Sequence, residues 1–381
     1  MEKAAAMALN RIFGFKPAVS LGLMDLLGCA SAAFGLSERE KEDIFGPYGG
    51  TAGMLDPGRM DEACSELERL LSDGYDFIPF TSPDYPAALK ECPDAPAGLY
   101  FRSCSTAAEV FGDRASISVV GTRDISPYGS EWCSRIVCRL ASSSPTPTIV
   151  SGLAFGVDVT AHLVALDNGA PTVAVLPTGI DDVYPFSHRR IADRIAGTAG
   201  CALVTDYPPG TKAQKINFLR RNRIIAGLSS CTILVESKIK GGGLMTARLA
   251  SGYGRDVFVL PGRIDDPRSG GCNILLKEKI AEPVTDLSGL PGALGLKAPD
   301  PGKQAGLNAI IDRLYGQDPQ ERTLRDICSA VRKRRGLSFD EICRLTGLDY
   351  GTVAACAGRL ESDGVISIDL AQRCVINRKY S

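Results

Sequence analysis

Apolar residues in the middle of the chain alternate between short β-branched runs and longer stretches with helical spacing. Six short runs predict strands, and they are Ile117–Val120, Thr148–Val150, Thr172–Pro177, Cys201–Thr205, Cys231–Glu236 and Asp256–Leu260. Stretches that predict helices lie between them, for example Tyr128–Ser142, Val157–Asn168 and Phe218–Leu228. Strands that alternate with helices predict βαβ units. The expected fold class is therefore α/β, with a central doubly wound, Rossmann-like parallel sheet.

The flanking segments differ from this pattern. Residues 1–76 predict short helices, with Leu67, Leu70 and Leu71 at helical spacing, whereas five prolines between residues 77 and 102 predict an extended connector. Proline and glycine are again frequent from Leu290 to Gly306. The predicted domains and connections are a small helical (SAM-like) domain at 1–76, a connector at 77–102, a Rossmann-like domain at 103–289, a linker at 290–306 and a C-terminal domain at 307–381.

The C-terminal segment has the pattern of a winged helix. Ser338 and Glu341 form a capping box at the start of one helix, and a second helix is expected from Tyr350 to Asp363. Two apolar runs beyond it could pair as a β-hairpin, and they are 365–368 and 374–376. The second helix carries Arg359 as its only basic residue. Both a DNA-binding role and a role as a packing or partner domain remain open for this unit.

Composition narrows the class of protein. Hydrophobic residues make up 44% and charged residues 23% of the 381 positions, which is typical of a globular protein. No apolar run reaches the ~20 residues of a membrane-spanning helix, so no membrane association is predicted. The thirteen cysteines are scattered and lack a C-x-x-C pair, which favours reduced thiols in a cytoplasmic protein. With two histidines, a histidine-rich metal site is excluded.

Charge is unevenly distributed along the chain. The totals of 43 basic and 44 acidic residues nearly cancel. Residues 1–76 contain 7 basic and 13 acidic side chains, whereas residues 211–255 contain 9 basic side chains and a single acidic one, Glu236. A neutral total therefore hides a concentrated positive segment, which predicts a polyanionic partner.

Glycine-rich turns follow four of the predicted strands, and they are Val120–Arg123, Ser151–Asp158, Lys240–Thr246 and Pro261–Arg263. Ligands of an open parallel sheet bind beyond the carboxyl ends of its strands. Backbone N–H groups at a helix start can hold an anion there, and the Arg123 guanidinium can grip a phosphate with two hydrogen bonds. The turn Gly121-Thr122-Arg123 is not a G-x-G-x-x-G dinucleotide motif, and no P-loop is present. No cofactor is predicted.

The basic segment favours nucleic acid as the partner. Lys215 and Phe218 are one helical turn apart, so a phosphate contact and a base-stacking ring would be neighbours. The apolar face of the same helix is expected to come from Leu219, Ile224, Ile225 and Leu228. The alternative is that Phe218 is itself a core residue that anchors this helix.

Catalytic candidates are few. His162 and His188 lack an obvious nucleophile or base partner and are expected to be structural. Asp158, at a predicted helix start, is expected to be a cap. We therefore predict a protein that is not an enzyme.

Four motifs occur in an order that resembles the DNA-processing protein A (DprA/Smf) family. They are Val120–Arg123, Ser151–Asp158, Arg221–Ser229 and Gly254–Gly262, and the resemblance runs from about Tyr85 to Asp286. It implies a bacterial cytoplasmic protein that binds incoming single-stranded DNA during natural transformation and shields it from nucleases. It further implies help in loading the RecA recombinase, a homodimer formed through the Rossmann-like domain, and no enzymatic activity.

By motif position, the resemblance makes Arg123 the DNA-gripping arginine, and Lys215 and Phe218 the lysine and the stacking aromatic. The chain departs from the family at Gly241-Gly242-Gly243-Leu244, where the family usually has Ser-Gly-Ser-Leu, so a hydroxyl is lost. The alternative is an enzyme similar to the cytokinin-activating phosphoribohydrolases. Their glycine turn is followed by a catalytic glutamate, whereas residues 244–248 contain no acid.

The full set of candidate DNA-binding residues combines these turns with the basic segment. They are Gly121, Thr122, Arg123, Ser151, Gly152, Ala154, Gly156, Lys215, Phe218, Arg221, Asn222, Arg223, Gly241, Gly242, Gly243 and Thr246. No catalytic or metal-ligating residue is predicted.

Overall fold

The structure is a computed structural model that describes residues 1–46, 50, 52–296, 311–312, 314–316, 318–334, 336–369 and 372–377. The chain divides into two compact units. The first comprises residues 1–141 and 145–296, and the second comprises residues 142–144 and 297–381.

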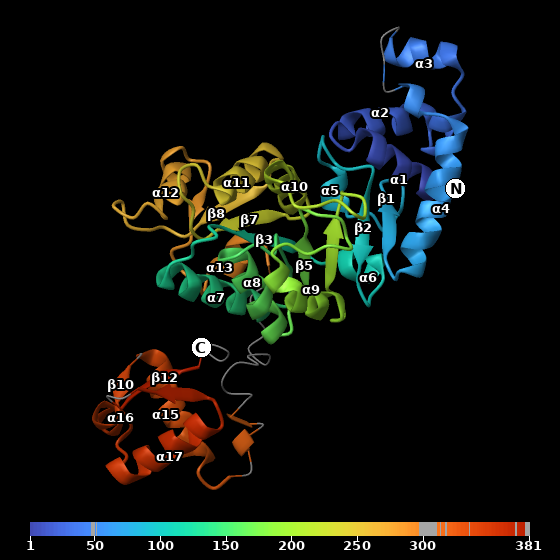
Figure 1. Cartoon of the computed structure of the whole chain (residues 1–381). Coiled ribbons are helices and arrows are strands. Elements are labelled where there is room, and N and C mark those ends of the chain that lie inside the picture. The colour runs from blue at the N-terminus through green and yellow to red at the C-terminus, as the bar shows by residue number, and fades with distance from the viewer. Residues whose placement is uncertain are drawn as a thin grey trace. The chain divides into compact units, whose positions relative to one another are not determined.

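A nine-stranded sheet forms the centre of the first unit, in the order β1-β2-β6-β5-β4-β3-β7-β8-β9 (Figure 1). The strands are β1 (Asp76–Pro79), β2 (Gly98–Arg102), β3 (Ser116–Val120), β4 (Thr148–Ser151), β5 (Thr172–Val175), β6 (Ala202–Thr205), β7 (Cys231–Leu234), β8 (Asp256–Val259) and β9 (Glu282–Pro283). The strands from β6 across to β9 are parallel, and Ile117 of β3 pairs with Ile149 of β4 and with Cys231 of β7. Parallel strands covered on both faces are apolar at nearly every position, which explains the continuous apolar runs.

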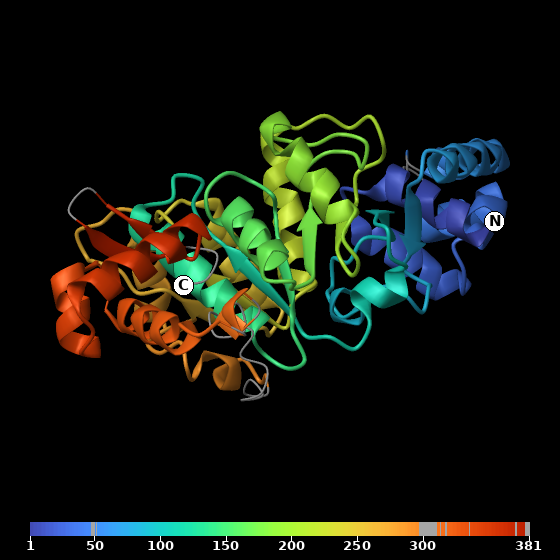
Figure 2. The same ribbon diagram turned by 90° about the horizontal axis from the view of Figure 1, so that it is seen from below.

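Helices cover both faces of this sheet (Figures 1 and 2). One face carries α10 (Lys215–Gly227), α11 (Gly242–Gly252) and α12 (Gly270–Lys277), and the other carries α7 (Pro127–Ala141), α8 (Val157–Asp167) and α9 (Arg189–Ala196). Two buried clusters separate the layers, one with Ile224 and Ala247 against the sheet and one with Ile136 and Ala161. The predicted doubly wound sheet is confirmed.

The N-terminal helices share a core with one end of the sheet. They are α1 (Glu2–Phe13), α2 (Pro17–Leu27), α3 (Glu38–Phe45) and α4 (Pro57–Ser72), with 3-10 turns η1 (Ser31–Gly35) and η2 (Ala52–Met54). Met7 and Leu9 of α1 belong to the same buried cluster as Phe77 of β1 and Tyr100 of β2. Figure 1 shows α1 and α4 beside β1. Residues 1–76 therefore pack as part of the first unit.

The predicted connector at 77–102 does more than link two domains. It is extended at both ends, but β1 pairs antiparallel with β2, and β2 pairs antiparallel with β6 through Tyr100 and Thr205. The short helix α5 (Ala87–Lys90) lies between the two strands, and α6 (Ala107–Phe111) follows them. Backbone hydrogen bonds to β6 thus make this segment an integral extension of the sheet, which the proline content did not reveal.

The predicted linker at 290–306 is described only in part. It begins with the short helix α13 (Leu290–Ala293), and Leu290 and Leu296 pack into the cluster beneath α7 and α8. Residues 297–306 lie outside the described residues.

The second unit has the predicted winged-helix elements. They are α15 (Glu321–Lys333), β10 (Leu337–Ser338), α16 (Phe339–Thr346), α17 (Tyr350–Ser362), β11 (Ile366–Ile368) and β12 (Arg373–Ile376). The capping box between Ser338 and Glu341 is present, and β11 and β12 pair as a hairpin. Arg359 of α17 forms an ion pair with Asp318 at 2.6 Å and lies over the Tyr315 ring. The basic residue of the second helix is thus held within its own unit.

None of the helices in the described part of the chain combines the length and hydropathy that crossing a bilayer requires.

Candidate nucleic-acid interface

The turns after β3, β4 and β7 meet at the carboxyl edge of the sheet. The chain proceeds from β3 through β4 and β5 to β6 in one direction and from β7 to β9 in the other, so strand order switches between β3 and β7. A Cβ atom on Gly243 would lie 2.9 Å from the Cα atom of Gly121, and one on Gly156 would lie 2.2 Å from the carbonyl oxygen of Thr122. Glycine therefore allows three of the four predicted turns to touch one another.

An exposed cluster of cations and aromatic rings lies beside these turns. The guanidinium carbon of Arg123 is 4.5 Å from the centroid of the Phe218 ring, and Tyr184 packs edge-on against Phe218 with centroids 5.3 Å apart. Lys215 is exposed one helical turn before Phe218, which is half-buried. Among the described residues, neither Arg123 nor Lys215 forms an ion pair. Tyr184 was missed from the sequence because it lies far from Phe218 along the chain.

Phe218 lies outside the hydrophobic clusters of the first unit. Its ring packs against Arg123 and Tyr184, and Tyr184 is itself 43% exposed. The alternative that Phe218 anchors the core is therefore disfavoured by the structure, whereas Ile224 and Ile225 of the same helix are fully buried.

Arg221 places a buried positive charge behind the turn that follows β4. Arg221 is only 3% exposed, and its Nε and Nη1 atoms have no hydrogen-bond partner among the described residues. A Cβ atom on Gly152 would lie 1.4 Å from Nη1, so the guanidinium rests directly against this glycine. Burial lowers the pKa of Arg221 to about 10, and the group stays charged at neutral pH. The positive charge beneath this turn favours an anion at the carboxyl edge.

The predicted site residues divide by exposure. The first group is exposed or half-buried and consists of Gly121, Thr122, Arg123, Gly156, Lys215, Phe218, Gly241 and Gly242. The second group is buried and consists of Ser151, Gly152, Ala154, Arg221, Asn222, Arg223, Gly243 and Thr246. The first group can contact a ligand directly, whereas most of the second can act only through the groups that it holds in place.

Three buried polar residues of the predicted site bond to other groups of the protein. Arg223 forms an ion pair with Asp206, Asn222 donates its side-chain N–H to the carbonyl oxygen of Gly242 at 3.4 Å, and Thr246 donates its hydroxyl to the same oxygen at 3.2 Å. Because these donors meet protein acceptors, we expect the three side chains to position the interface rather than to contact DNA. Asn222 ties α10 to the start of α11, Thr246 bonds within α11, and Arg223 ties α10 to the end of β6.

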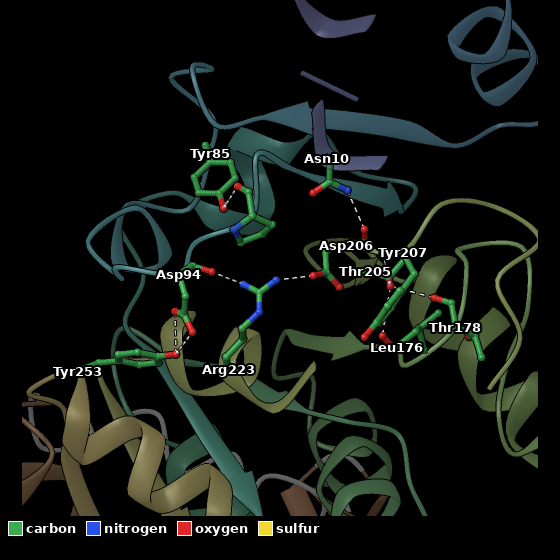
Figure 3. A network of polar contacts seen from close by, with 11 residues as sticks. Asn10, Tyr85, Asp94, Leu176, Thr178, Thr205, Asp206, Tyr207, Arg223 and Tyr253 are labelled. Atoms are coloured by element: carbon green, nitrogen blue, oxygen red, sulfur yellow. Dashed lines mark hydrogen bonds and ion pairs between the residues drawn. The ribbon is translucent and has the colours of Figure 1, made fainter. Parts of the chain in front are cut away.

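A chain of polar contacts joins α10 to three other parts of the first unit (Figure 3). Asn10 of α1 donates to the backbone oxygen of Asp206 at 2.7 Å, and the Asp206 carboxylate pairs with Arg223. Arg223 also donates to the backbone oxygen of Asp94, whose carboxylate accepts the Tyr253 hydroxyl at 2.8 Å. The helix that carries Lys215 and Phe218 is therefore tied to the N-terminal helices, to the segment between β1 and β2, and to the end of α11.

The acid–base candidates of the region are engaged in structural contacts. His162 shares a hydrogen bond of 2.7 Å with the hydroxyl of Thr172, and burial lowers the pKa of His162 to about 3, so its ring is neutral. His188 bonds the backbone oxygen of Leu153 at 2.8 Å. Asp158 is the second residue of α8, whose N-cap is Gly156 without a side-chain cap hydrogen bond, so the prediction that Asp158 is the cap is wrong. Its carboxylate instead accepts the N–H of Ala154 at 3.4 Å, and burial raises its pKa. What the arrangement offers at the carboxyl edge is positive charge and an aromatic stacking surface.

The fold and the edge cluster define a class: a doubly wound α/β protein with a basic, aromatic interface at its switch point and an appended winged helix. Residues 76–292 match the family described as DNA recombination-mediator protein A, and residues 320–367 match the winged helix-turn-helix DNA-binding family. The chain belongs to the DNA recombination-mediator protein A family, which confirms the resemblance that its motifs carry.

Individual relatives agree with this assignment. The chain is 34% identical to Protein Smf of Synechocystis over 78% of its own length and 79% of the relative's, and 34% identical to the DNA processing protein DprA of Streptococcus pneumoniae over 63% and 83%. Among solved structures, DprA of S. pneumoniae superimposes with a TM-score of 0.58 at 30% identity, covering 74% of this chain and 97% of that one. DprA of Helicobacter pylori, whose structure concerns its single-stranded DNA binding mode, gives 0.51 at 28%, covering 58% and 95%.

Proposed function

We propose that this protein binds single-stranded DNA as a DNA-processing protein of natural transformation, and that it protects the incoming strand and helps to load the RecA recombinase. It acts without catalysis, in the cytoplasm, and as a homodimer formed through the Rossmann-like domain. Family membership supports the role in DNA recombination, and the thirteen free thiols suit a reducing compartment.

The observation that carries the proposal is the contact of Arg123 with Phe218 at the carboxyl edge, with Lys215 one helical turn away. A ring for base stacking beside unpaired cations for phosphates is the combination that single-strand binding sites use. The buried guanidinium of Arg221, whose Nε and Nη1 atoms have no hydrogen-bond partner among the described residues, lies beneath the neighbouring turn and adds positive charge at that edge.

Binding of fluorescent oligonucleotides, single-stranded against blunt duplex, tests the proposal in a salt titration. We expect tighter binding of the single strand, little sequence selectivity, and log affinity that falls with log salt by about 0.7 per neutralised phosphate. Equal affinity for duplex and single strand, or an affinity that is indifferent to salt, would count against it.

Replacing Arg123 by alanine is expected to weaken single-strand binding by about 1.5–3 kcal/mol, the range for hydrogen bonds to charged groups. Lysine at this position should restore only part of the affinity, because an ammonium lacks the planar fork of the guanidinium. Arg263→Ala is the matched control, since Arg263 also follows a strand but is paired with Asp265 at 2.7 Å. A folded Arg123→Ala protein with normal affinity would show that Arg123 does not contact the DNA.

Stacking and charge can be separated within one turn of α10. Phe218→Ala should cost about 1–3 kcal/mol of binding free energy and leave the salt slope nearly unchanged. Lys215→Ala should instead lower the slope by about 0.7, because one counterion fewer is released. A melting curve for each variant serves as the control. Lost stability with intact affinity in the folded fraction would return Phe218 to a structural role.

A further inference from the structure

We propose that Phe15 and Arg220 form a second stacking platform for single-stranded DNA, so that a strand bound at Phe218 continues across α10 onto the N-terminal helices. This inference rests on the proposed function and extends its site to residues that neither the motifs nor the family resemblance pointed to.

The pair has the same composition as the cluster at the carboxyl edge. The guanidinium carbon of Arg220 lies 4.0 Å from the centroid of the Phe15 ring, compared with 4.5 Å between Arg123 and Phe218. Phe15, in the turn after α1, is 67% exposed, so much of its ring remains open to solvent. Arg220 forms no ion pair among the described residues. An exposed aromatic ring with an unpaired cation on it can accept a base and a phosphate together.

The exposed side chains of α10 connect the two platforms. At 100° per residue, the outward-facing positions follow one another around the helix axis over about 200°. Their order is Phe218, Lys215, Leu219, Ile216 and Arg220. Leu219 is 38% and Ile216 is 45% exposed, so apolar surface lies between the two cations, Lys215 and Arg220, along this arc. A strand that crosses a helix of ~10–12 Å diameter would keep contact with α10 over its whole path.

The N-terminal helices are held rigidly enough to present Phe15 at a defined place. Asn10, one turn and a half before Phe15 in the chain, donates to the backbone oxygen of Asp206 at 2.7 Å. Asp206 is in turn paired with Arg223 of α10, so α1 and α10 are connected through a single buried residue (Figure 3). A platform whose two halves are fixed in this way loses little conformational entropy when a base stacks on it.

A small cavity with a mixed apolar and polar lining adjoins the second platform. Its volume is about 170 Å³, and its lining includes Asn10, Phe15, Asp206, Gln214 and Asn217. Asp206 is 7% exposed, and its Oδ1 atom has no hydrogen-bond partner among the described residues. The cavity is smaller than the ~300 Å³ of ordinary small-molecule pockets, which suits the edge of one base better than a whole nucleotide. The side-chain amide of Gln214, which is exposed at this cavity, can accept from the amino groups that unstacked bases carry.

The two-platform arrangement predicts a dependence on strand length. With the full chain, we would measure the affinity for oligothymidylates of about 6 and about 20 nucleotides, which span the range of single-strand site sizes. Phe15→Ala should weaken binding of the long strand about 5- to 150-fold, the equivalent of one base–aromatic stack, and leave the short strand unchanged within about twofold. Arg220→Gln should lower the salt slope by about 0.7 for the long strand only.

Leu26→Ala is the matched control, because Leu26 is an exposed apolar residue of the N-terminal helices, at 64%, and lies in α2 rather than in the turn that carries Phe15. It should change neither affinity. If wild-type protein fails to bind single strands of either length, the proposed function itself is wrong. If Arg123→Ala loses binding while Phe15→Ala and Arg220→Gln bind the long strand like the wild type, the second platform is overturned.

Discussion

Replacing Asp206 by alanine is expected to destabilise the first unit by about 3–5 kcal/mol. The Asp206 and Arg223 side chains are only 7% and 10% exposed, and they pair with each other. Removing the carboxylate would leave the Arg223 guanidinium buried with one backbone acceptor, the oxygen of Asp94, and no countercharge. Chemical denaturation followed by a probe in the first unit would measure the loss. Single-strand affinity should fall with it, because α10 carries Lys215 and Phe218.

Asp182→Ala provides the control for this prediction. Asp182 pairs with Lys212 at 3.3 Å, but the lysine side chain is 76% exposed, so the pair should contribute only about 0–1 kcal/mol. Similar losses for Asp206→Ala and Asp182→Ala would show that the buried network does not hold α10 in place.

Gly156→Ala is expected to have the second large effect, a loss of about 1–3 kcal/mol from backbone conformation and a further ~1–3 kcal/mol from steric overlap. Gly156 has a φ of 77° and a ψ of −122°, which side chains other than glycine rarely tolerate. Its new Cβ atom would lie 2.2 Å from the backbone oxygen of Thr122 and 2.8 Å from the carbonyl carbon of Arg123. The turn that presents Arg123 would have to move, so both thermal stability and single-strand affinity should fall.

Gly169→Ala separates conformation from contact. Gly169 also has a positive φ, 67°, but a Cβ atom there would meet nothing within 4 Å. We expect it to cost only the ~1–2 kcal/mol of left-handed backbone and to leave affinity unchanged. Normal DNA binding by Gly156→Ala would mean that the turn adjusts without displacing Arg123.

Most of the architecture of the first unit could be predicted from local pattern. The β-branched runs became β3 to β8 with ends shifted by a residue or two, and the glycine turns gathered at one edge because parallel strands share their carboxyl end. In the second unit, the spacing of Ser338 and Glu341 was enough to locate the start of α16. These features depend on neighbours in the chain, which is why the sequence reveals them.

The roles of individual side chains on α10 were less predictable. Leu219 was expected on the apolar face, yet it is exposed, and Arg223 was expected at the DNA, yet it is buried in an ion pair. Arg223 is held by Asp94 and Asp206, which come from the segment between β1 and β2 and from the end of β6. Helical periodicity gives the angle between two side chains but not which side of the helix meets the sheet.

The sequence by itself determined the order of strands and helices, the glycine turns, the positive segment and the candidates Arg123, Lys215 and Phe218. Only the tertiary structure decided that β1 and β2 join the sheet, that Tyr184 completes the aromatic cluster, and that Phe15 meets Arg220. The physical reason is the same in each case. Backbone pairing and ring contacts between segments distant in the chain arise from the packing of the whole unit, and no local pattern of residues encodes them.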